Sequence, residues 1–178
     1  MPAEKAPRTS LDAVALLERD HDQLKLLFKE FEKAKQPQFK LELARHICEK
    51  LGLHAEVEEQ TFYPAIKAIP KMRDIVLESL EEHRQIKALI AEVAGMEPSD
   101  LTFAPKMKVL GEDFGRHVQD EESEMLPRVR NGLGKKKLLE LAHEMKLLTH
   151  TLKGDAATGP ERITEPVRES RTTGKQKA

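Results

Sequence analysis

The apolar residues of this chain recur every three or four positions, which is the pattern of helices that bury one face. Four long stretches and one shorter stretch show it: about 11–34, 39–68, 72–94, 105–131 and 135–152. The connections between the long stretches are short, and short connections favour antiparallel neighbours. We therefore predict an all-α protein, an antiparallel up-down-up-down four-helix bundle with a short fifth C-terminal helix and a disordered tail.

Individual residues mark the expected ends of these helices. Thr9 or Ser10 can cap the first helix, because short hydroxyl side chains accept hydrogen bonds from the free N–H groups of a first turn. Pro37 is expected to end this helix, since proline cannot continue the hydrogen-bond ladder. Pro64 should bend the second helix, and Gly95 should stop the third.

The composition fits one helical domain with loose ends. A chain of 178 residues is long enough to bury one substantial core. It is 39% hydrophobic, 34% charged and only 4% aromatic, which is typical of helices packed by aliphatic residues rather than of sheets. We expect a flexible arm over residues 1–9, the bundle domain over 10–152, and a disordered tail over 153–178, which has almost no large apolar residue.

Charge and cysteine content narrow the choice of partners and compartment. A net charge of −1 gives no electrostatic reason to expect nucleic acid or an anionic membrane as a partner. No stretch reaches the roughly 20 apolar residues needed to cross a bilayer, and the first ten residues contain no apolar run of signal-peptide length. Cys48 is the only cysteine, which excludes an internal disulfide. We therefore expect a cytoplasmic protein.

An internal repeat carries the candidate chemistry. HAEVEEQTFYP, which begins at His54, and HVQDEESEMLP, which begins at His117, both read His-x-x-x-Glu-Glu-x-x-x-(Tyr/Leu)-Pro and lie 63 positions apart. Upstream, ERDHDQLK around His21 aligns with LEEHRQIK around His83 at an offset of 62 positions. The spacing His-x-x-x-Glu alone is weak evidence, but the shared continuation and the matched offsets indicate a unit used twice.

The repeated residues predict a metal centre. Residues four apart share one face of a helix, so each His-x-x-x-Glu pair can point into the bundle, beside one solitary histidine from each other helix. The six predicted ligands are His21, His54, Glu58, His83, His117 and Glu121. Two buried carboxylates are costly unless they are paired or coordinated, and two divalent cations would compensate them. Imidazole and carboxylate together suit iron, with manganese and zinc as competitors.

This arrangement resembles the hemerythrin-like (HHE cation-binding) domain, over about residues 10–152. The resemblance implies a non-haem di-iron centre that binds O2 or related small oxidants. Carried onto this chain, it implies that His21 and His54 hold one iron and that His83 and His117 hold the other. It also implies that Glu58 and Glu121 bridge the two ions, together with an oxo or hydroxo group.

The chain departs from the oxygen-carrying members of that family at two places. Those members have a His-x-x-x-His pair on the third helix, whereas Ser79 and Lys87 lie four positions either side of His83. Their last bridging ligand is an Asp five residues after the histidine, whereas Glu121 follows His117 by four. The expected role therefore shifts from reversible O2 carriage towards reaction with peroxide or nitric oxide, redox sensing, protection against oxidative stress, or iron storage. Whether the protein is an enzyme that consumes peroxide or nitric oxide is left open.

Several neighbouring residues have more than one interpretation. Glu59 and Glu122 are candidates for hydrogen-bond partners of the ligand histidines, for alternative ligands, or for surface charges. Tyr63 is expected chiefly to pack, although it can approach the site. Cys48 is expected to be a small buried hydrophobe. The three remaining histidines are expected to be surface or packing residues: His46, His143 and His150.

Two other functions compete with the hemerythrin-like prediction. Glu18-x-x-His21 and Glu140-x-x-His143 match the Glu-x-x-His string of ferritin-like di-iron proteins, but they lie outside the repeat. The second competitor is an interaction module without metal, whose inward polar residues serve only the specificity of the fold. The contacts of Glu18 and Glu140 distinguish the first of these from the repeat-based site.

Overall fold

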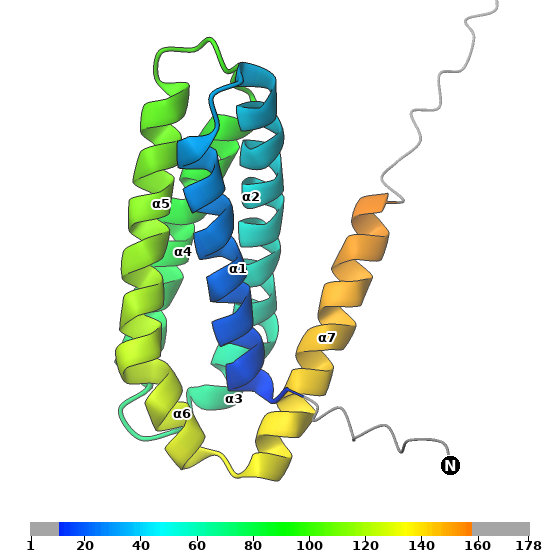
Figure 1. Ribbon diagram of the computed structural model, residues 1–178. Coiled ribbons are helices and arrows are strands. Elements are labelled where there is room, and N and C mark those ends of the chain that lie inside the picture. The colour runs from blue at the N-terminus through cyan, green and yellow to red at the C-terminus, as the bar shows by residue number, and fades with distance from the viewer. Residues whose placement is uncertain (1–10, 158–178) are drawn as a thin grey trace, which may run out of the picture.

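The protein is described by a computed structural model of residues 11–157. Four long helices run side by side with short connections, as the apolar pattern predicts, so the all-α bundle is confirmed (Figure 1). They are α1 (Ala13–Lys33), α2 (Pro37–Val57), α4 (Arg73–Ala94) and α5 (Phe103–Asp120). No helix in this part of the chain combines the length and apolar composition that crossing a membrane requires.

The helix ends differ in part from the expected ones. Asp12 caps α1, because its side chain accepts a hydrogen bond of 2.9 Å from the N–H of Ala15; Thr9 and Ser10 lie outside the described residues. Pro37 does not end α1, which stops at Lys33, but opens α2. Proline fits a first turn because the N–H group it lacks would have no partner there. Gly95 follows α4 as its C-cap, as predicted.

The predicted second and fourth helices are each interrupted by a wide turn. Two π-helical segments, η1 (Glu58–Phe62) and η2 (Glu121–Met125), continue into the short α3 (Tyr63–Ile66) and into α6 (Leu126–Gly132). The N–H of Tyr63 donates to the carbonyl of Glu58, and the N–H of Leu126 donates to that of Glu121, five residues back in both cases. A proline follows each donor and has no N–H to offer to an α-helical ladder. The repeat therefore places the same distortion at the same point in both halves.

The last helix, α7 (Lys135–Ala157), is longer than predicted. It packs along α1, α2 and η1, and its far end leans away from the bundle (Figure 1). It continues past the expected end at Leu152, so residues 153–157 are helical and the short fifth helix is as long as the others. The apolar pattern stops at Leu152 and gives no signal for these extra residues. The predicted arm over 1–9 and the rest of the tail lie outside the described residues.

The hydrophobic core consists of two clusters with a polar layer between them. One cluster holds Leu17, Phe62, Met125 and the buried side of α7. The other holds Leu24 and Phe114 and continues to the end of α1, the start of α2, the end of α4 and the start of α5. His21 lies between Leu17 and Leu24 on α1, and the other helices place buried polar residues at the same level. The two apolar clusters thus enclose the candidate site from both ends.

Candidate metal centre

The fold brings all six predicted ligands into one buried layer. The histidines come from four different helices: His21 from α1, His54 from α2, His83 from α4 and His117 from α5. The carboxylates are the first residues of the two wide turns, Glu58 of η1 and Glu121 of η2. None of the six is more than 4% exposed. The sequence therefore identified the buried polar residues of this layer, apart from Ser79. The Ser79 hydroxyl donates a hydrogen bond to the backbone carbonyl of Ile75 in its own helix.

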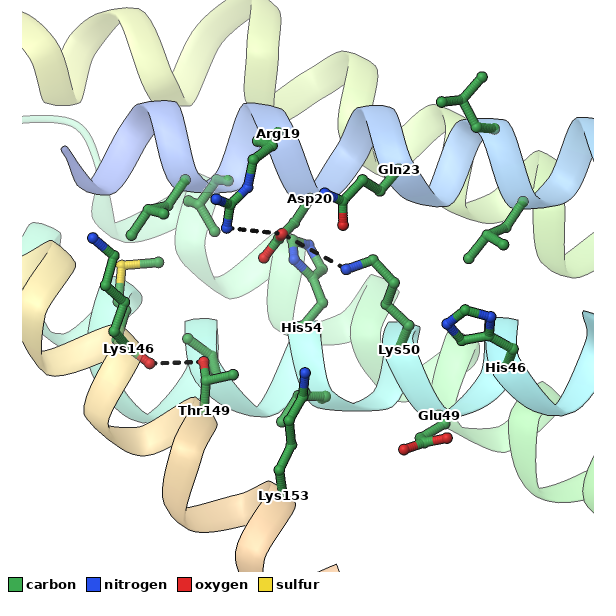
Figure 2. A pocket seen from close by; sticks show the side chains of 17 residues that line it. Arg19, Asp20, Gln23, His46, Glu49, Lys50, His54, Lys146, Thr149 and Lys153 are labelled. Atoms are coloured by element: carbon green, nitrogen blue, oxygen red, sulfur yellow. Dashed lines mark hydrogen bonds and ion pairs between the residues drawn. The ribbon is translucent and has the colours of Figure 1, made fainter. Parts of the chain in front are cut away.

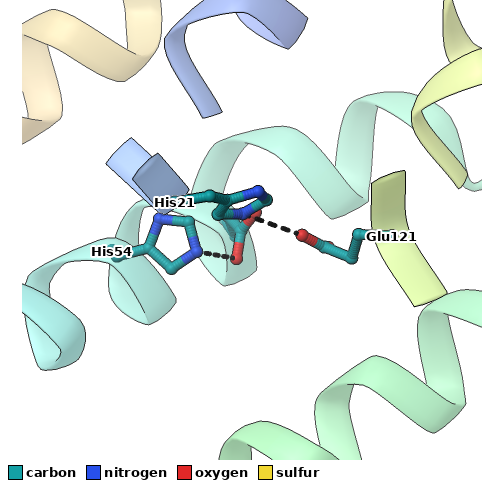
Figure 3. Close-up of side chains that lie close together, drawn as sticks. His21, His54 and Glu121 are labelled. Carbon is teal, nitrogen blue, oxygen red and sulfur yellow. Dashed lines mark ion pairs between the residues drawn. The ribbon is translucent and has the colours of Figure 1, made fainter. Parts of the chain in front are cut away.

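Each carboxylate reaches one histidine of each half of the repeat. Glu58 Oε2 lies 3.2 Å from His54 Nε2 and 3.3 Å from His83 Nε2. Glu121 Oε2 lies 3.6 Å from His117 Nε2 and 3.3 Å from His21 Nε2. His21, His54 and Glu121 converge from three sides (Figure 3). The two glutamates thus exchange places when one half of the repeat is mapped onto the other.

The polar atoms of this layer are suited to binding cations. His21 Nε2, His54 Nε2, Glu58 Oε1 and Glu121 Oε2 are buried and have no hydrogen bond within the described residues. Nearly all buried polar atoms in native proteins are hydrogen-bonded, and an orphaned one costs about 1–3 kcal/mol. Metal coordination would satisfy them. The residues form two groups, and within each group the potential ligand atoms all lie within 4.8 Å of one another. Glu58 belongs to both groups. They are His21, His54, Glu58 and Glu121, and Glu58, His83 and His117.

Without metal, only some of the titratable side chains in the layer are charged. Burial and the nearby Glu121 charge raise the pKa of Glu58 well above its ordinary value, so Glu58 keeps a proton. Burial alone would raise the pKa of Glu121, but His117 and His21 outweigh it and lower that pKa. Burial and the neighbouring His21 lower the pKa of His54, and burial and His117 lower the pKa of His83 to about 4.

The lowered pKa of His83 predicts a contribution to the stability of the metal-free protein that is lost in acid. A histidine whose pKa is lowered on folding stabilises the protein above its unfolded pKa, and this contribution is lost as the pH falls towards the folded pKa. For His83 the window runs from 6.5 down to about 4, and the loss is about 3 kcal/mol. His54 acts in the same direction, whereas the raised pKa values of His117 and Glu58 oppose it. Urea unfolding of the metal-free protein beside a His83→Gln variant isolates the contribution of His83. Between pH 6.5 and 4 the free energy of unfolding of the unchanged protein should drop relative to that of the variant, and a constant difference would contradict the lowered pKa of His83.

Three of the four histidines have a carboxylate on the ring nitrogen that faces away from the centre. His21 Nδ1 lies 3.0 Å from Glu122, His83 Nδ1 lies 3.1 Å from Glu59, and His117 Nδ1 lies 2.9 Å from Glu82. Of the roles considered for Glu59 and Glu122, the structure thus supports that of histidine partner. Glu82 was not predicted from the sequence, although its place beside His83 in the repeat was a signal.

The outer carboxylates are themselves held by lysines. Lys25 donates to both oxygens of Glu122 at 3.1 Å, and Lys87 donates to Glu59 at 2.9 Å. Such contacts orient the imidazole, fix its tautomer and raise its basicity towards a metal. Lys87, one of the two residues four positions from His83, therefore serves the ligand set from outside.

Tyr63 belongs to the layer rather than only to the core. Its hydroxyl donates to Glu121 Oε1 at 2.9 Å and lies 3.4 Å from both Glu58 Oε2 and His83 Nε2. The ring is 2% exposed and packs at 5.5 Å from the His83 ring. The packing role given to Tyr63 is thus incomplete, because its hydroxyl touches both carboxylates. The wide turn of η1 carries Tyr63 to this position, and the apolar pattern of the sequence does not predict that turn.

The residues outside the repeat lie away from the centre. His46, His143 and His150 are exposed, as predicted. Glu18 pairs with Arg130 at 2.7 Å and Glu140 with Lys136 at 3.8 Å, both on the surface. Because neither of these glutamates reaches the centre, the ferritin-like ligand set is not formed.

Cys48 is buried, as predicted, and has no disulfide partner. Burial raises the pKa of its thiol to about 11. The thiol is therefore protonated near neutral pH and a poor nucleophile, since the thiolate is the reactive form. This environment supports a packing role and gives no support to a redox role.

Comparison with known proteins agrees with this geometry. The family model for the hemerythrin HHE cation binding domain matches residues 12–129, which include all six buried ligand candidates. The chain belongs to this family. A crystal structure of a hemerythrin HHE cation binding domain-containing protein from Mycobacterium kansasii superposes with a TM-score of 0.71, covering 83% of this chain and 91% of that one at 21% identity. The hemerythrin-like bundle is therefore the observed fold.

A curated relative shares sequence but is much longer. A DNA nickase from a Nostoc species is 28% identical over 147 residues, which are 81% of this chain and 42% of that protein. The hemerythrin-like chain described here thus spans less than half of the length of this relative.

Proposed function

We propose that this hemerythrin-like protein holds two iron ions in its polar layer and reacts there with a small oxidant, peroxide or nitric oxide in preference to reversible O2 carriage. The observation that carries the proposal is the set of buried carboxylate and imidazole atoms that face one another without hydrogen bonds. These atoms belong to four side chains, His21, His54, Glu58 and Glu121, and leaving them without cations would be a large cost to the fold. With cations they form a ligand set.

The ligand roles follow from the distances between the side chains. We assign His21 and His54 to one ion, and His83 and His117 to the other. Glu58 lies within 3.3 Å of a histidine on each side and Glu121 within 3.6 Å, which supports a bridging role for both. When bound, the two ions supply redox capacity and open coordination positions for a small molecule. Four imidazoles with two carboxylates suit iron better than the oxygen-rich sites of magnesium or calcium.

The protein itself excludes water from this layer and supplies a proton donor. The Phe114 ring packs edge-on against the His21 ring at 6.2 Å and against the His54 ring at 6.4 Å. Phe62 and Met125 are fully buried on the other side. The Tyr63 hydroxyl, 2.9 Å from Glu121, holds a proton close to the position of the ions. A small oxidant bound there would meet a dry site with one protic group.

The residues of α4 on either side of His83 support reaction with an oxidant over reversible carriage of O2. Ser79 donates its hydroxyl to the carbonyl of Ile75, and Lys87 is engaged by Glu56 and Glu59. Neither replaces the missing fifth histidine, so the ligand set leaves one more position open than in oxygen carriers. An additional open position favours exchange of bound molecules and oxidation of the ions.

The buried layer of this chain does not suit the DNA-nicking activity that the name of the longer relative indicates. Two-metal sites can cleave phosphodiesters, but the six candidate ligands are at most 4% exposed and lie inside the bundle. Duplex DNA cannot reach such a layer while the bundle is folded.

The reaction is tested on anaerobically reduced, iron-loaded protein mixed with O2, peroxide or nitric oxide in a stopped-flow spectrometer. We expect peroxide or nitric oxide to react fully and quickly, and O2 to oxidise the iron instead of leaving again under vacuum. Reversible O2 binding without oxidation of the iron would contradict the proposal.

The outer carboxylates should control metal affinity. Glu122→Gln removes the charge that holds His21 and should weaken metal binding about 10–100-fold, the typical cost of losing such a partner. Glu124→Gln is the matched control, because Glu124 is only two residues away but pairs with Arg128 on the surface. Competition with a chelator measures both affinities; equal values for the two variants would show that Glu122 does not support a ligand.

Tyr63→Phe should destabilise the protein by about 1–3 kcal/mol, because the buried Oε1 of Glu121 loses the hydrogen bond of 2.9 Å that the Tyr63 hydroxyl donates to it. Phenylalanine keeps the ring and its packing, so the change isolates the hydroxyl. Urea unfolding at equal metal content measures it. Unchanged stability would mean that the Tyr63 hydroxyl contributes nothing to the layer.

A further inference from the structure

The outer hydrogen bonds of the histidines are incomplete at one position. Nδ1 of His54 is buried and has no hydrogen bond in the described part of the chain, whereas the other three histidines have a carboxylate there. The repeat aligns Asp20 with Glu82, the residue that bonds to His117. By this symmetry Asp20 should serve His54. Its side chain is one methylene shorter than that of Glu82, and it pairs instead with Arg19 and Lys50, at 3.7 Å each.

A cavity opens beside His54. It has a volume of about 650 Å³ and lies between α1, α2 and α7, with His54 among its lining residues. Figure 2 shows Arg19, Asp20, Lys50 and His54 gathered between α1 and α2, with Lys146 and Lys153 of α7 on the facing side. This volume is in the range of small-molecule sites. The cavity therefore joins the outer side of the metal layer to the surface.

The lining has two chemical parts. Aliphatic side chains from all three helices form the walls, among them Leu27, Leu53 and Met145. The polar groups are mainly cationic: Arg19, Lys50, Lys146 and Lys153 against Asp20 and Glu49. Neither Lys146 nor Lys153 forms an ion pair with an acidic side chain among residues 11–154. An apolar body with one negative group matches this lining.

We propose that this cavity binds a monocarboxylate with an aliphatic body, whose carboxylate pairs with Lys50 and accepts a hydrogen bond from Nδ1 of His54. The inference rests on the proposed metal centre in one respect: coordination through Nε2 leaves Nδ1 as the protonated nitrogen, which needs an acceptor. The ligand would supply the carboxylate that Asp20 is too short to supply. Asp20 is 33% exposed in its side chain and held only by ion pairs, so it can move aside.

Occupancy of the cavity should also strengthen the metal centre. A carboxylate on the outer nitrogen of a ligand histidine raises the basicity of the ring. Because coupling between two sites is reciprocal, the ligand should raise the affinity for iron by the same factor as iron raises the affinity for the ligand, and a chelator should then remove iron less readily. This effect separates the proposed site from unspecific binding of an amphiphile to the surface.

The test is calorimetric titration of octanoate into the iron-loaded full chain, with octan-1-ol as the neutral probe of equal length. We expect one saturable octanoate site, at least tenfold weaker binding of octanol, and slower iron loss in the presence of octanoate. Lys50→Gln should weaken octanoate binding on the order of tenfold, since a charge-assisted contact is lost. Lys136→Gln, an α7 lysine whose side chain is 92% exposed and outside the cavity, should leave it unchanged.

Asp20→Glu gives the sharpest variant. The longer side chain should reach Nδ1 of His54 as Glu82 reaches that of His117, abolish octanoate binding, and slow iron loss without any ligand. Iron-loaded protein that binds no octanoate, or binds octanol equally well, overturns the inference while the metal centre stands. If protein that takes up no metal still binds octanoate in preference to octanol, the proposed ligand site stands and the proposed metal centre is overturned. Protein that takes up neither overturns both.

Discussion

Replacing His54 or Glu121 by alanine is expected to abolish most metal binding, whereas His143→Ala leaves it unchanged. His54 and Glu121 are buried and contribute atoms to the same group of potential ligands. His143 is exposed on α7 and outside both groups. Loss of a direct ligand should cost more than the about 10–100-fold that is typical for an outer partner. Metal per chain, measured after identical purification, is the readout.

Folding has to be separated from ligation in these variants. Glu121→Gln keeps the shape and the hydrogen bond from Tyr63 but removes the charge, so it should also lower metal content in a protein that retains its helical circular dichroism. Equal metal losses in the His54, Glu121 and His143 variants would undo the assignment of the ligands.

Removing the metal is expected to have the largest effect on stability. Ions that bind only the folded state stabilise it by about 4 kcal/mol when present at a thousand times their dissociation constant. In a domain of this size each kcal/mol corresponds to roughly 2–4 °C in Tm, so a chelator should lower Tm by about 10 °C or more. The metal-free layer must also keep a proton on Glu58 beside the ionised Glu121.

Scanning calorimetry with and without chelator measures this shift, and ferrous iron added back should restore it. An unchanged Tm would favour the interaction module without metal, in which the polar layer serves only the fold. If zinc restored Tm and iron did not, the bound metal would be zinc, and the assignment of the ligands would stand.

The helices and the ligand candidates were predictable because both leave periodic signals. The three- and four-residue spacing places Leu17, His21 and Leu24 on one face of α1, and the structure buries all three. The repeat distinguishes the two His-x-x-x-Glu pairs of the sequence from pairs that arise by chance. Side chains four apart share a face of a helix whatever packs around it, so His54 and Glu58 could be placed together before any tertiary contact was known.

The remaining features depend on long-range contacts that a periodic pattern does not encode. The wide turns at Glu58 and Glu121 exchange one set of backbone hydrogen bonds for another without changing the apolar pattern. Their position brings the Tyr63 hydroxyl to Glu121, 58 residues away in the chain. The bond between Glu82 and His117 joins two helices, so the place of Glu82 beside His83 in the repeat does not reveal which histidine it serves. Residues 153–157 extend α7 without apolar residues that would mark a buried face.

The most direct test of the metal centre is the metal content per chain of aerobically purified protein, measured together with its optical spectrum. We predict about two iron ions per chain and oxo-to-iron charge-transfer bands in the near ultraviolet. Protein that contains no metal, and takes up none when ferrous iron is added, would contradict the central claim and leave a helical bundle with an unexplained layer of buried charge.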